Sequence, residues 1–306
     1  MAGSLTGVPQ QALAMGLALA GAMSYAIASV TQQRAAAKLT TKLSFDPVLV
    51  LRLVRARPWL LSLIAVVIGY GLQAAALDLG RLVIVEPVFP LGLLMALLLA
   101  ARAEGRRLKV PEWSAAVAAV AGLGVFLVAA EPSGGQRTAP SPSLAGAAAG
   151  AVLVAVLCWL ASLKVAAPHR ALVLSIGGGI GAGVTDALTK TVAALAGILH
   201  FAVFGDVRLY LLALVGLLTL TMQQNAFRAA GLAASLPAFA VLEPIVGSLL
   251  GLFVYHEHVG GGGIRITVEV LAVLAALWGI AQLANSVIAE LARLAALTSQ
   301  PADPAA

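Results

Sequence analysis

Charged residues are scarce in this chain of 306 residues, because Asp, Glu, Lys and Arg together make up only 10% of it. Soluble domains carry about 25% charged residues, so a soluble protein is excluded. Hydrophobic residues reach 61% and the mean hydropathy is +0.99. These values are typical of an integral membrane protein without a separate soluble domain.

Cysteine occurs once, at Cys158 inside an apolar run. A single cysteine excludes intramolecular disulfide bonds and cysteine-based metal sites, so we expect it to contribute to packing. Spacings typical of a nucleophile with its base, a phosphate loop or HExxH are also missing. The sequence therefore predicts neither an enzyme nor a cofactor.

The net charge is +6, which in a soluble protein would suggest nucleic acid as a partner. In a membrane protein Lys and Arg mostly mark the cytoplasmic loops, so we expect lipid and no nucleic acid as partners. Arg outnumbers Lys, and alanine is abundant. This composition is typical of a GC-rich bacterial genome, and we expect a location in the bacterial plasma membrane.

Nine apolar segments are long enough to cross a membrane, and they must be helices because unpaired backbone groups cannot face lipid. They cover about 11–31, 58–79, 82–102, 111–130, 144–165, 170–198, 208–229, 231–254 and 264–286. The basic segment 47–57 is interpreted as an interfacial amphipathic helix, and the alternative is a degenerate tenth span. The loop 131–143 is predicted to be a flexible joint and 291–306 a disordered tail.

Alternating the loops between the two sides places 14 of the 19 basic residues on one side. Because cytoplasmic loops carry the excess of Lys and Arg, the N-terminus is predicted outside and the C-terminus inside.

A pattern beginning at Gln73 recurs at Gln224, an offset of 151 residues. In each copy a glycine follows seven residues later, and prolines follow the glycine: Pro87 and Pro90 in the first copy, Pro237 and Pro244 in the second. We expect these prolines to break their helices at the centre of each half. The first repeat spans 1–143, a connecting span covers 144–169, and the second repeat spans 170–290.

The predicted span near Leu82 runs inward and its counterpart near Leu232 runs outward, so the repeats are inverted. The fold class is therefore an all-α membrane protein with nine to ten helices in two inverted repeats. Such repeats place a substrate site at their interface near the middle of the membrane.

Two stretches, LDLGRLVIVEPVFPLGLLMALLLAARAEGRRLKVPEWSAAVAAVAGLGVFLV and SLPAFAVLEPIVGSLLGLFVYHEHV, resemble the paired EamA-type halves of the drug/metabolite transporter superfamily. The stretch GAGVTDALTK is most similar to actinobacterial members that neighbour the NIPA-type magnesium transporters. This resemblance implies a transporter with ten helices and a Glu near the end of each proline-bearing helix, at Glu104 and Glu257. The family has a basic residue after the second Glu, whereas this chain has His258.

Ionisable residues inside the membrane are costly, so they are candidates for the pathway of a substrate or ion. Four residues in predicted spans are selected as candidates: Glu86, Asp186, Lys190 and Glu243. Asp186 and Lys190 are four residues apart on one helix face and are expected to pair. This pair is either a buried salt bridge or a site for ion coupling or substrate charge, and neighbouring Thr185 adds a hydroxyl.

Glu86 and Glu243 each directly precede a proline. Proline lacks an N–H group, so the carbonyl four residues earlier loses its donor. A carboxylate beside a freed carbonyl can bind a cation or a proton, and the alternative is a structural kink.

Gln73, Gln224 and Asn225 lie at the ends of equivalent helices, where they either line the pathway or form interhelical hydrogen bonds. The run His256 to His258 resembles a metal cluster, but adjacent side chains on one helix diverge, so a solvated turn is favoured. No metal ligand is assigned.

These features predict a secondary transporter of a small polar metabolite, coupled to protons or ions. A NIPA-like magnesium transporter is the alternative, and a membrane subunit that transports nothing is the third. Lys190 beside Asp186 favours a metabolite, because a buried ammonium repels Mg²⁺. A homodimer remains open.

Overall fold

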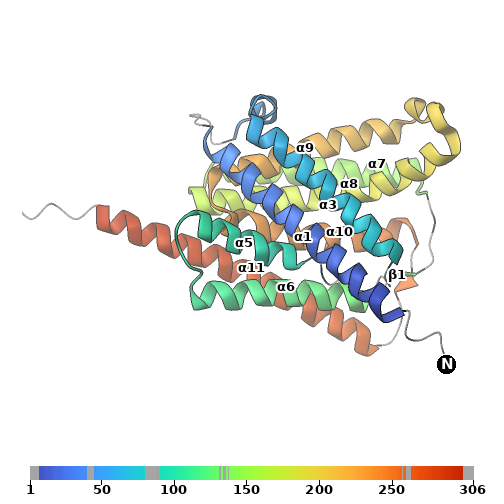
Figure 1. Cartoon of the computed structure of the whole chain (residues 1–306). Coiled ribbons are helices and arrows are strands. Elements are labelled where there is room, and N and C mark those ends of the chain that lie inside the picture. The colour runs from blue at the N-terminus through green and yellow to red at the C-terminus, as the bar shows by residue number, and fades with distance from the viewer. Residues whose placement is uncertain are drawn as a thin grey trace, which may run out of the picture.

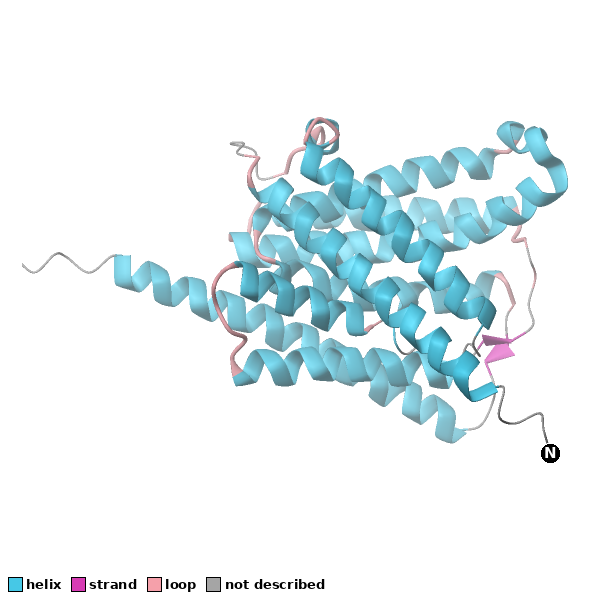
Figure 2. Ribbon diagram, in the orientation of Figure 1, coloured by secondary structure: helices cyan, strands magenta, loops and turns pink. Residues whose placement is uncertain are grey.

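The computed structural model describes residues 7–39, 45–79, 88, 90–130, 132–133, 136, 138–256, 258–259 and 263–298. Almost all of them belong to helices that cross one bundle, and the two strands are a two-residue pair at one end of it (Figures 1 and 2). In chain order the elements are α1 (Gly7–Ala37), α2 (Leu49–Leu53), α3 (Arg57–Leu79), α5 (Leu91–Ala103), α6 (Val110–Ala130), β1 (Pro132–Ser133), α7 (Ser141–Ser162), α8 (Ala167–Leu199), the 3-10 helix η2 (His200–Gly205), α9 (Val207–Ala229), α10 (Leu232–Val254), β2 (His258–Val259) and α11 (Gly263–Thr298).

Seven helices of the described part, namely α1 and α6 to α11, are long and apolar enough to cross a membrane. Two more, α3 and α5, carry shorter apolar stretches, Arg57–Gln73 and Leu91–Ala103. The chain is thus an all-α multi-pass membrane protein. By length and composition the described residues give seven candidate spans, and the nine predicted would require α3 and α5 to cross as well.

Most helix boundaries lie within a few residues of the prediction, with two exceptions. The described helix in the third predicted span begins at Leu91, with Pro90 as its N-cap residue, and most of 80–89 lies outside the described residues. Pro90 therefore directly precedes a helix, and most of the segment before it lies outside the described residues. The predicted disordered tail is wrong at its start, because α11 continues to Thr298.

The basic segment 47–57 contains α2, a helix of five residues. Five residues rise only about 7.5 Å, so α2 cannot span a membrane. Leu49 and Leu53 are completely buried, and α2 packs against α9 and α1. The alternative of a tenth span is excluded, and the apolar side of α2 contacts protein.

Pro237 and Pro244 both lie inside α10, which is continuous from Leu232 to Val254. The prediction that they break the helix is wrong. Each proline removes one hydrogen-bond donor, but neighbouring helices surround α10 and allow it to continue.

The packing follows two similar patterns. In the first half α1 packs along α3 and α5, and in the second half α8 packs along α9 and α10. The longest contact joins α6 to α11, where small residues bring the backbones together. A Cβ on Gly122 would lie 2.6 Å from the Ala272 carbonyl oxygen, and one on Gly279 would lie 2.5 Å from the Ala115 carbonyl oxygen.

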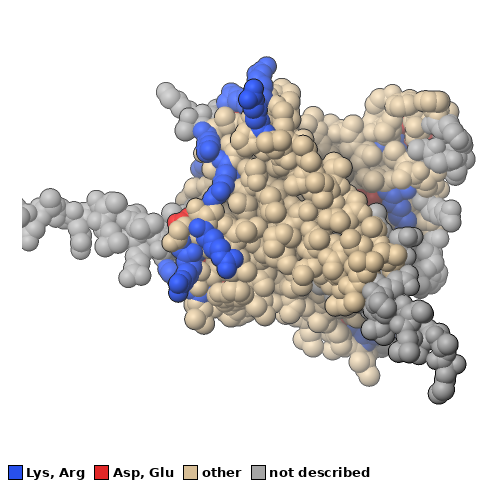
Figure 3. All heavy atoms as spheres, in the orientation of Figure 1, with Lys and Arg blue, Asp and Glu red and all other residues tan. Residues whose placement is uncertain are grey.

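The helices run between the same two ends of the bundle, so the charged residues near the helix ends lie close to one another. The described part of α1 begins at one end, and α11 finishes at the opposite end (Figure 1). Lys and Arg side chains gather mainly at the end where α1 finishes, and the middle of the face shown carries none (Figure 3). This distribution fits helices that cross a bilayer.

The loop 131–143 was predicted to be a flexible joint, but its described residues are tied to the bundle. β1 pairs antiparallel with β2, and the Gln136 N–H donates to the Tyr255 carbonyl at 2.9 Å. Ala139 is buried, accepts from Arg208 Nη1 at 3.1 Å, and donates its N–H to Thr191 Oγ1 at 3.1 Å. These bonds fasten the loop to α8, α9 and the end of α10.

Candidate functional site

A cavity of about 730 Å³ lies between the helices of both halves. Its walls come from α1, α3, α5, α6, α8, α9 and α10, and no described residue of α7 or α11 lines it. Sites for small molecules commonly measure about 300–1,000 Å³. The cavity is therefore large enough to enclose a small metabolite.

A second hollow of about 440 Å³ lies between α7 and α9. All eight residues that line it are Ala, Val or Leu. Without a polar group it offers no means to orient a polar ligand. We therefore place the candidate site in the central cavity.

Two carboxyl groups meet in the central cavity, Asp186 from α8 and Glu243 from α10. Their side chains share a hydrogen bond. Ionised carboxylates only accept hydrogen bonds, so a bond between these two groups requires a proton on one of them. Gly183 permits this approach of α8 and α10, because a Cβ there would lie 2.7 Å from the Glu243 carbonyl oxygen.

Lys190 does not form the predicted pair with Asp186. Its ammonium nitrogen lies 4.3 Å from the ring centroid of Tyr255, and Lys190 does not line the cavity. The Tyr255 ring is held in place because its hydroxyl lies 2.7 Å from Thr191 Oγ1. A fixed aromatic ring attracts the ammonium group, while Asp186 bonds to Glu243.

Polar groups from several helices surround the carboxyl pair. The Tyr25 hydroxyl donates to Gln73 Oε1 at 3.1 Å and joins α1 to α3. The ring of Tyr70 stands edge-on to that of Tyr25, with centroids 5.4 Å apart. Thr185 also lines the cavity and donates its hydroxyl to the Gly181 carbonyl at 2.8 Å. The structure thus brings Gln73 and Thr185 to the candidate site.

Sequence reasoning missed several lining residues, among them Tyr70, Gln32, Thr219 and Gln223. Gln32 and Gln223 each stand beside another glutamine, and Thr219 is two residues from Thr221, so the sequence does not single out these positions. Gln223 directly precedes the predicted Gln224, and only the rotation of α9 decides which of the two faces the cavity.

Gln224 and Asn225 are fully buried outside the cavity wall. Gln224 Oε1 accepts from Trp59 Nε1 at 3.2 Å, and Gln224 Nε2 donates to Gln32 Oε1 at 3.0 Å. Asn225 bonds the backbone N–H of Asp46 at 2.8 Å and its carbonyl at 3.0 Å. The predicted interhelical hydrogen bonding is confirmed for Gln224, whereas Asn225 bonds to Asp46 in the segment before α2.

Asp46 is a buried acid that the sequence analysis did not select. It precedes α2 and has no exposed surface, and Arg52 Nη1 lies 2.9 Å from its Oδ2. Its Oδ1 accepts from the Val48 N–H at 3.1 Å. Together with Asn225, Asp46 fastens the segment before α3 to α9. The sequence signal that could have identified Asp46 is its position directly before the basic segment 47–57.

Three of the predicted residues, Glu86, Pro87 and Glu257, lie outside the described residues.

The predicted combination of a carboxyl group and a freed carbonyl occurs in the second half. Pro244 removes the usual donor of the Ala240 carbonyl, and Ala240, Glu243 and Pro244 all line the cavity. Pro90 lines it from the first half.

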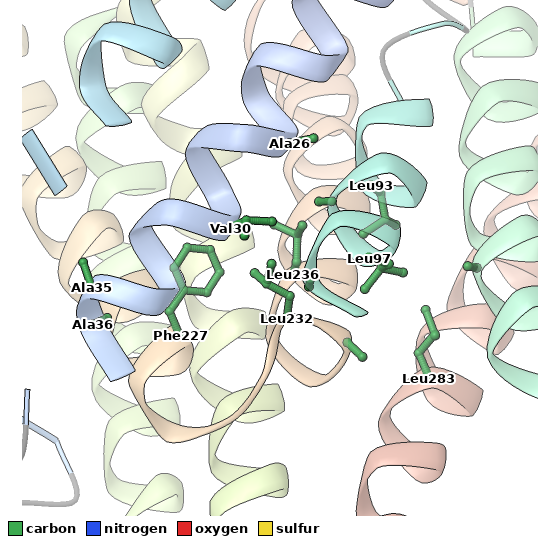
Figure 4. Packing of buried hydrophobic residues seen from close by; sticks show 14 of the residues in the cluster. Ala26, Val30, Ala35, Ala36, Leu93, Leu97, Phe227, Leu232, Leu236 and Leu283 are labelled. Atoms are coloured by element: carbon green, nitrogen blue, oxygen red, sulfur yellow. The ribbon is translucent and has the colours of Figure 1, made fainter. Parts of the chain in front are cut away.

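Towards the Lys/Arg-rich end a hydrophobic cluster packs beside the cavity. Ala26, Leu93 and Leu236 belong both to the lining and to this cluster. Beyond them Val30 of α1 and Leu97 of α5 continue the packing, and Phe227, Leu232 and Leu283 complete it from α9, α10 and α11 (Figure 4).

Among the described residues no group of three or more His, Cys, Asp or Glu side chains is placed to hold a metal ion. His256 follows the C-cap of α10 with φ of 53°, the left-handed conformation with which many helices end. This geometry agrees with the turn predicted there.

Comparisons with known proteins give one informative relative. The chain is 31% identical over 248 residues to a protein of Corynebacterium glutamicum named "Uncharacterized protein Cgl0250/cg0304", and the match covers 80% of this chain and 85% of that protein. No protein-family model matches the chain. No solved structure matches it. With this identity and coverage, the chain belongs to the same family as the corynebacterial protein.

Proposed function

We propose that this membrane protein is a secondary transporter of a small polar metabolite, coupled to protons through Asp186 and Glu243. One observation carries the proposal: a hydrogen-bonded carboxyl pair lies in a cavity of about 730 Å³ between the two halves. The proposed relationship is to the EamA-type branch of the drug/metabolite transporters, and the proposed role is not enzymatic.

The carboxyl pair supports coupling because it can store and release a proton. Taking a full charge into a membrane is costly, so buried carboxyl groups in transporters commonly exchange protons. The hydrogen bond between Asp186 and Glu243 holds one proton between α8 and α10. A substrate that interrupts this bond alters the affinity for that proton, and binding and protonation are then linked.

Reciprocal packing of α6 against α11 supports the two inverted repeats. In α6 the small residues Ala115, Ala119 and Gly122 repeat the spacing of Ala272, Ala276 and Gly279 in α11. Each glycine packs on the two alanines of the other helix. Reciprocal contacts between antiparallel helices are what a two-fold axis produces.

Nine crossings with the N-terminus outside remain our proposed topology in a bacterial plasma membrane. The described part of α1 begins at one end of the bundle and α11 finishes at the other, which supports an odd number of crossings (Figure 1). The gathering of Lys and Arg at one end supports a cytoplasmic location for that end (Figure 3).

Alternating access would require the hydrophobic cluster to open. Val30 of α1 and Leu97 of α5 must then separate from Phe227 and Leu232. These contacts join α1 and α5 of the first half to α9 and α10 of the second, so rocking one half against the other would expose the cavity.

Flux in proteoliposomes tests the proposal. Liposomes containing the protein are loaded with a metabolite mixture, a pH gradient is imposed, and mass spectrometry identifies what crosses. We expect gradient-driven flux that Asp186→Asn and Glu243→Gln abolish. Glu269→Gln in α11 is the matched control, because Glu269 does not line the cavity. A membrane subunit without transport activity would show no flux with any of these proteins.

Magnesium transport is the second candidate, and the position of Lys190 favours it more than the sequence did. The ammonium group that would repel Mg²⁺ lies over Tyr255 and not in the cavity wall. Saturable Mg²⁺ uptake that Glu243→Gln abolishes would establish this function instead.

A further inference from the structure

The cavity wall is acidic and aromatic. Of the described residues that line it, only Asp186 and Glu243 carry ionisable carboxyl groups, and none is Lys, Arg or His. An anionic group entering this cavity would lose its water without gaining a positive partner, which is unfavourable. The wall therefore selects against substrates with a net negative charge.

A positively charged group can replace the proton that the carboxyl pair shares. In that exchange the proton leaves the pair for solvent, and the two carboxylates accept N–H bonds from an ammonium group. One positive charge leaves and one enters, so the charge of the cavity stays constant. Tyr25 of α1 and Tyr70 of α3 are the other titratable side chains on the lining, and α5, α6 and α9 contribute none.

Three aromatic rings complete the environment of a cation. Tyr25, Tyr70 and Phe239 come from α1, α3 and α10. Aromatic faces attract ammonium groups, and the many Ala, Val and Leu residues of the wall suit a hydrocarbon part. Mg²⁺ instead requires oxygen ligands or water on all sides. The mixture of carboxyl groups, rings and apolar wall suits an organic ion better than a hydrated metal.

We infer that the substrate of the proposed transporter is a small organic cation. Its ammonium group takes the place of the proton between Asp186 and Glu243, and its compact apolar part packs against Tyr25, Tyr70 and Phe239. This inference rests on the proposed function and names the substrate class of the same cavity.

A matched set of probes tests the charge requirement. The full chain in detergent is given cyclohexylmethylammonium, cyclohexylmethanol, cyclohexanecarboxylate or Mg²⁺, and thermal unfolding and proton release are measured. We expect only the ammonium probe to raise the unfolding temperature and to release one proton per molecule bound. While the pair holds its proton, the Kd should tighten about tenfold per pH unit of increase.

Variants assign the effect to the cavity. Asp186→Asn and Glu243→Gln should abolish proton release, and the control Glu269→Gln should retain it. If either cavity variant fails to fold, proton release by the unaltered protein still decides the question. Equal stabilisation by the alcohol, stabilisation by the carboxylate or by Mg²⁺ alone, or no effect of any probe would overturn the substrate class.

Flux measurements separate this inference from the proposed function. Binding of the ammonium probe without flux driven by a pH gradient would overturn transport and leave the ligand class intact. Gradient-driven flux of the carboxylate probe would confirm a transporter and overturn the organic cation.

Discussion

At the scale of single residues, Asp186 and Lys190 show how a helix face can mislead. Side chains four residues apart on a helix can contact each other, but each can also contact a neighbouring helix. Asp186 reaches Glu243 on α10, and Lys190 reaches the ring of Tyr255. The two residues that the sequence predicts to pair therefore lie in different environments. Asp186 lines the cavity, and Lys190 does not.

Lys190→Ala and Asp186→Asn should consequently differ in effect. We expect Lys190→Ala to retain at least about half of the proton-driven flux, because Lys190 does not line the cavity and its cation–π contact with Tyr255 contributes about 0.5–2 kcal/mol. Asp186→Asn should reduce flux to background, since an amide cannot exchange a proton with Glu243. Initial rates in proteoliposomes measure both. Equal loss of flux in the two variants would show that Lys190 belongs to the transport pathway.

Asp206 provides a pH-dependent contact outside the spans. It is the N-cap residue of α9, and its hydrogen bonds from the Arg208 side chain and backbone lower the pKa of its carboxyl group from 3.8 to about 2. Since the folded state has the lower pKa, this contribution to stability is fully present well above pH 4. It is lost as the pH falls through about 4 towards 2.

Asp206→Ala should therefore destabilise the protein at pH 7 by about 1 kcal/mol, the usual value of an N-cap. The difference from the unaltered protein should shrink as the pH is lowered from 5 to 3. Thermal unfolding in detergent at several pH values measures it. A difference that stays constant over this range would show that the carboxylate charge is not involved.

At the scale of helices, small residues decide how closely the elements approach. Lipid offers no hydrophobic drive for helix pairing, so close backbone contact at Gly and Ala contributes much of the association. Gly122 and Gly279 provide such contacts between α6 and α11, and Gly183 provides one between α8 and α10. Gly146 and Gly150 of α7, by contrast, have nothing within 4 Å of an added Cβ.

Gly279→Ala should destabilise the bundle by about 1–3 kcal/mol, because the added methyl group collides with the backbone of α6. Gly146→Ala is the matched control and should be neutral or slightly stabilising, since alanine favours helix. The unfolding temperatures of the two variants in detergent provide the comparison. Destabilisation by Gly146→Ala of the same size would contradict the assignment of α6 and α11 as a close-packed pair.

The sequence predicts the helices well because composition and length determine them in a membrane. The boundaries of α6, α8, α9 and α10 are each within about three residues of the prediction. What the prediction lacked was helix rotation, which decides that Gln223 faces the cavity and Gln224 does not. Apolar helices carry little amphipathic signal, and their rotation follows from contacts such as Trp59 with Gln224.

Proline was the other source of error. An isolated helix would bend or end at Pro237 and Pro244, but α10 is enclosed by α5, α6, α8, α9 and α11 and stays continuous. The effect of Pro244 is local. It leaves the helix continuous but removes the hydrogen-bond donor of the Ala240 carbonyl, beside Glu243 at the cavity wall.

At the scale of the whole molecule, the candidate site depends on both halves. Tyr25 and Gln73 come from the first half, and Asp186 and Glu243 from the second. Neither half alone encloses the cavity. A cavity shared by two halves changes its access when the halves move relative to each other, and this geometry connects the fold to the proposed transport.

Opposite ends of this bundle must face opposite sides of the membrane if α6, α7 and α8 all cross it. Arg107 precedes α6 at the Lys/Arg-rich end, and Phe201 follows α8, 87% exposed. In a Cys158→Ala background, Arg107→Cys should be labelled by an impermeant thiol reagent only from the cytoplasmic side. Phe201→Cys should be labelled only from outside, because three crossings separate the two positions. Labelling of both from one side would mean that one of these three helices does not span, and the positive-inside assignment would then apply to a different set of loops.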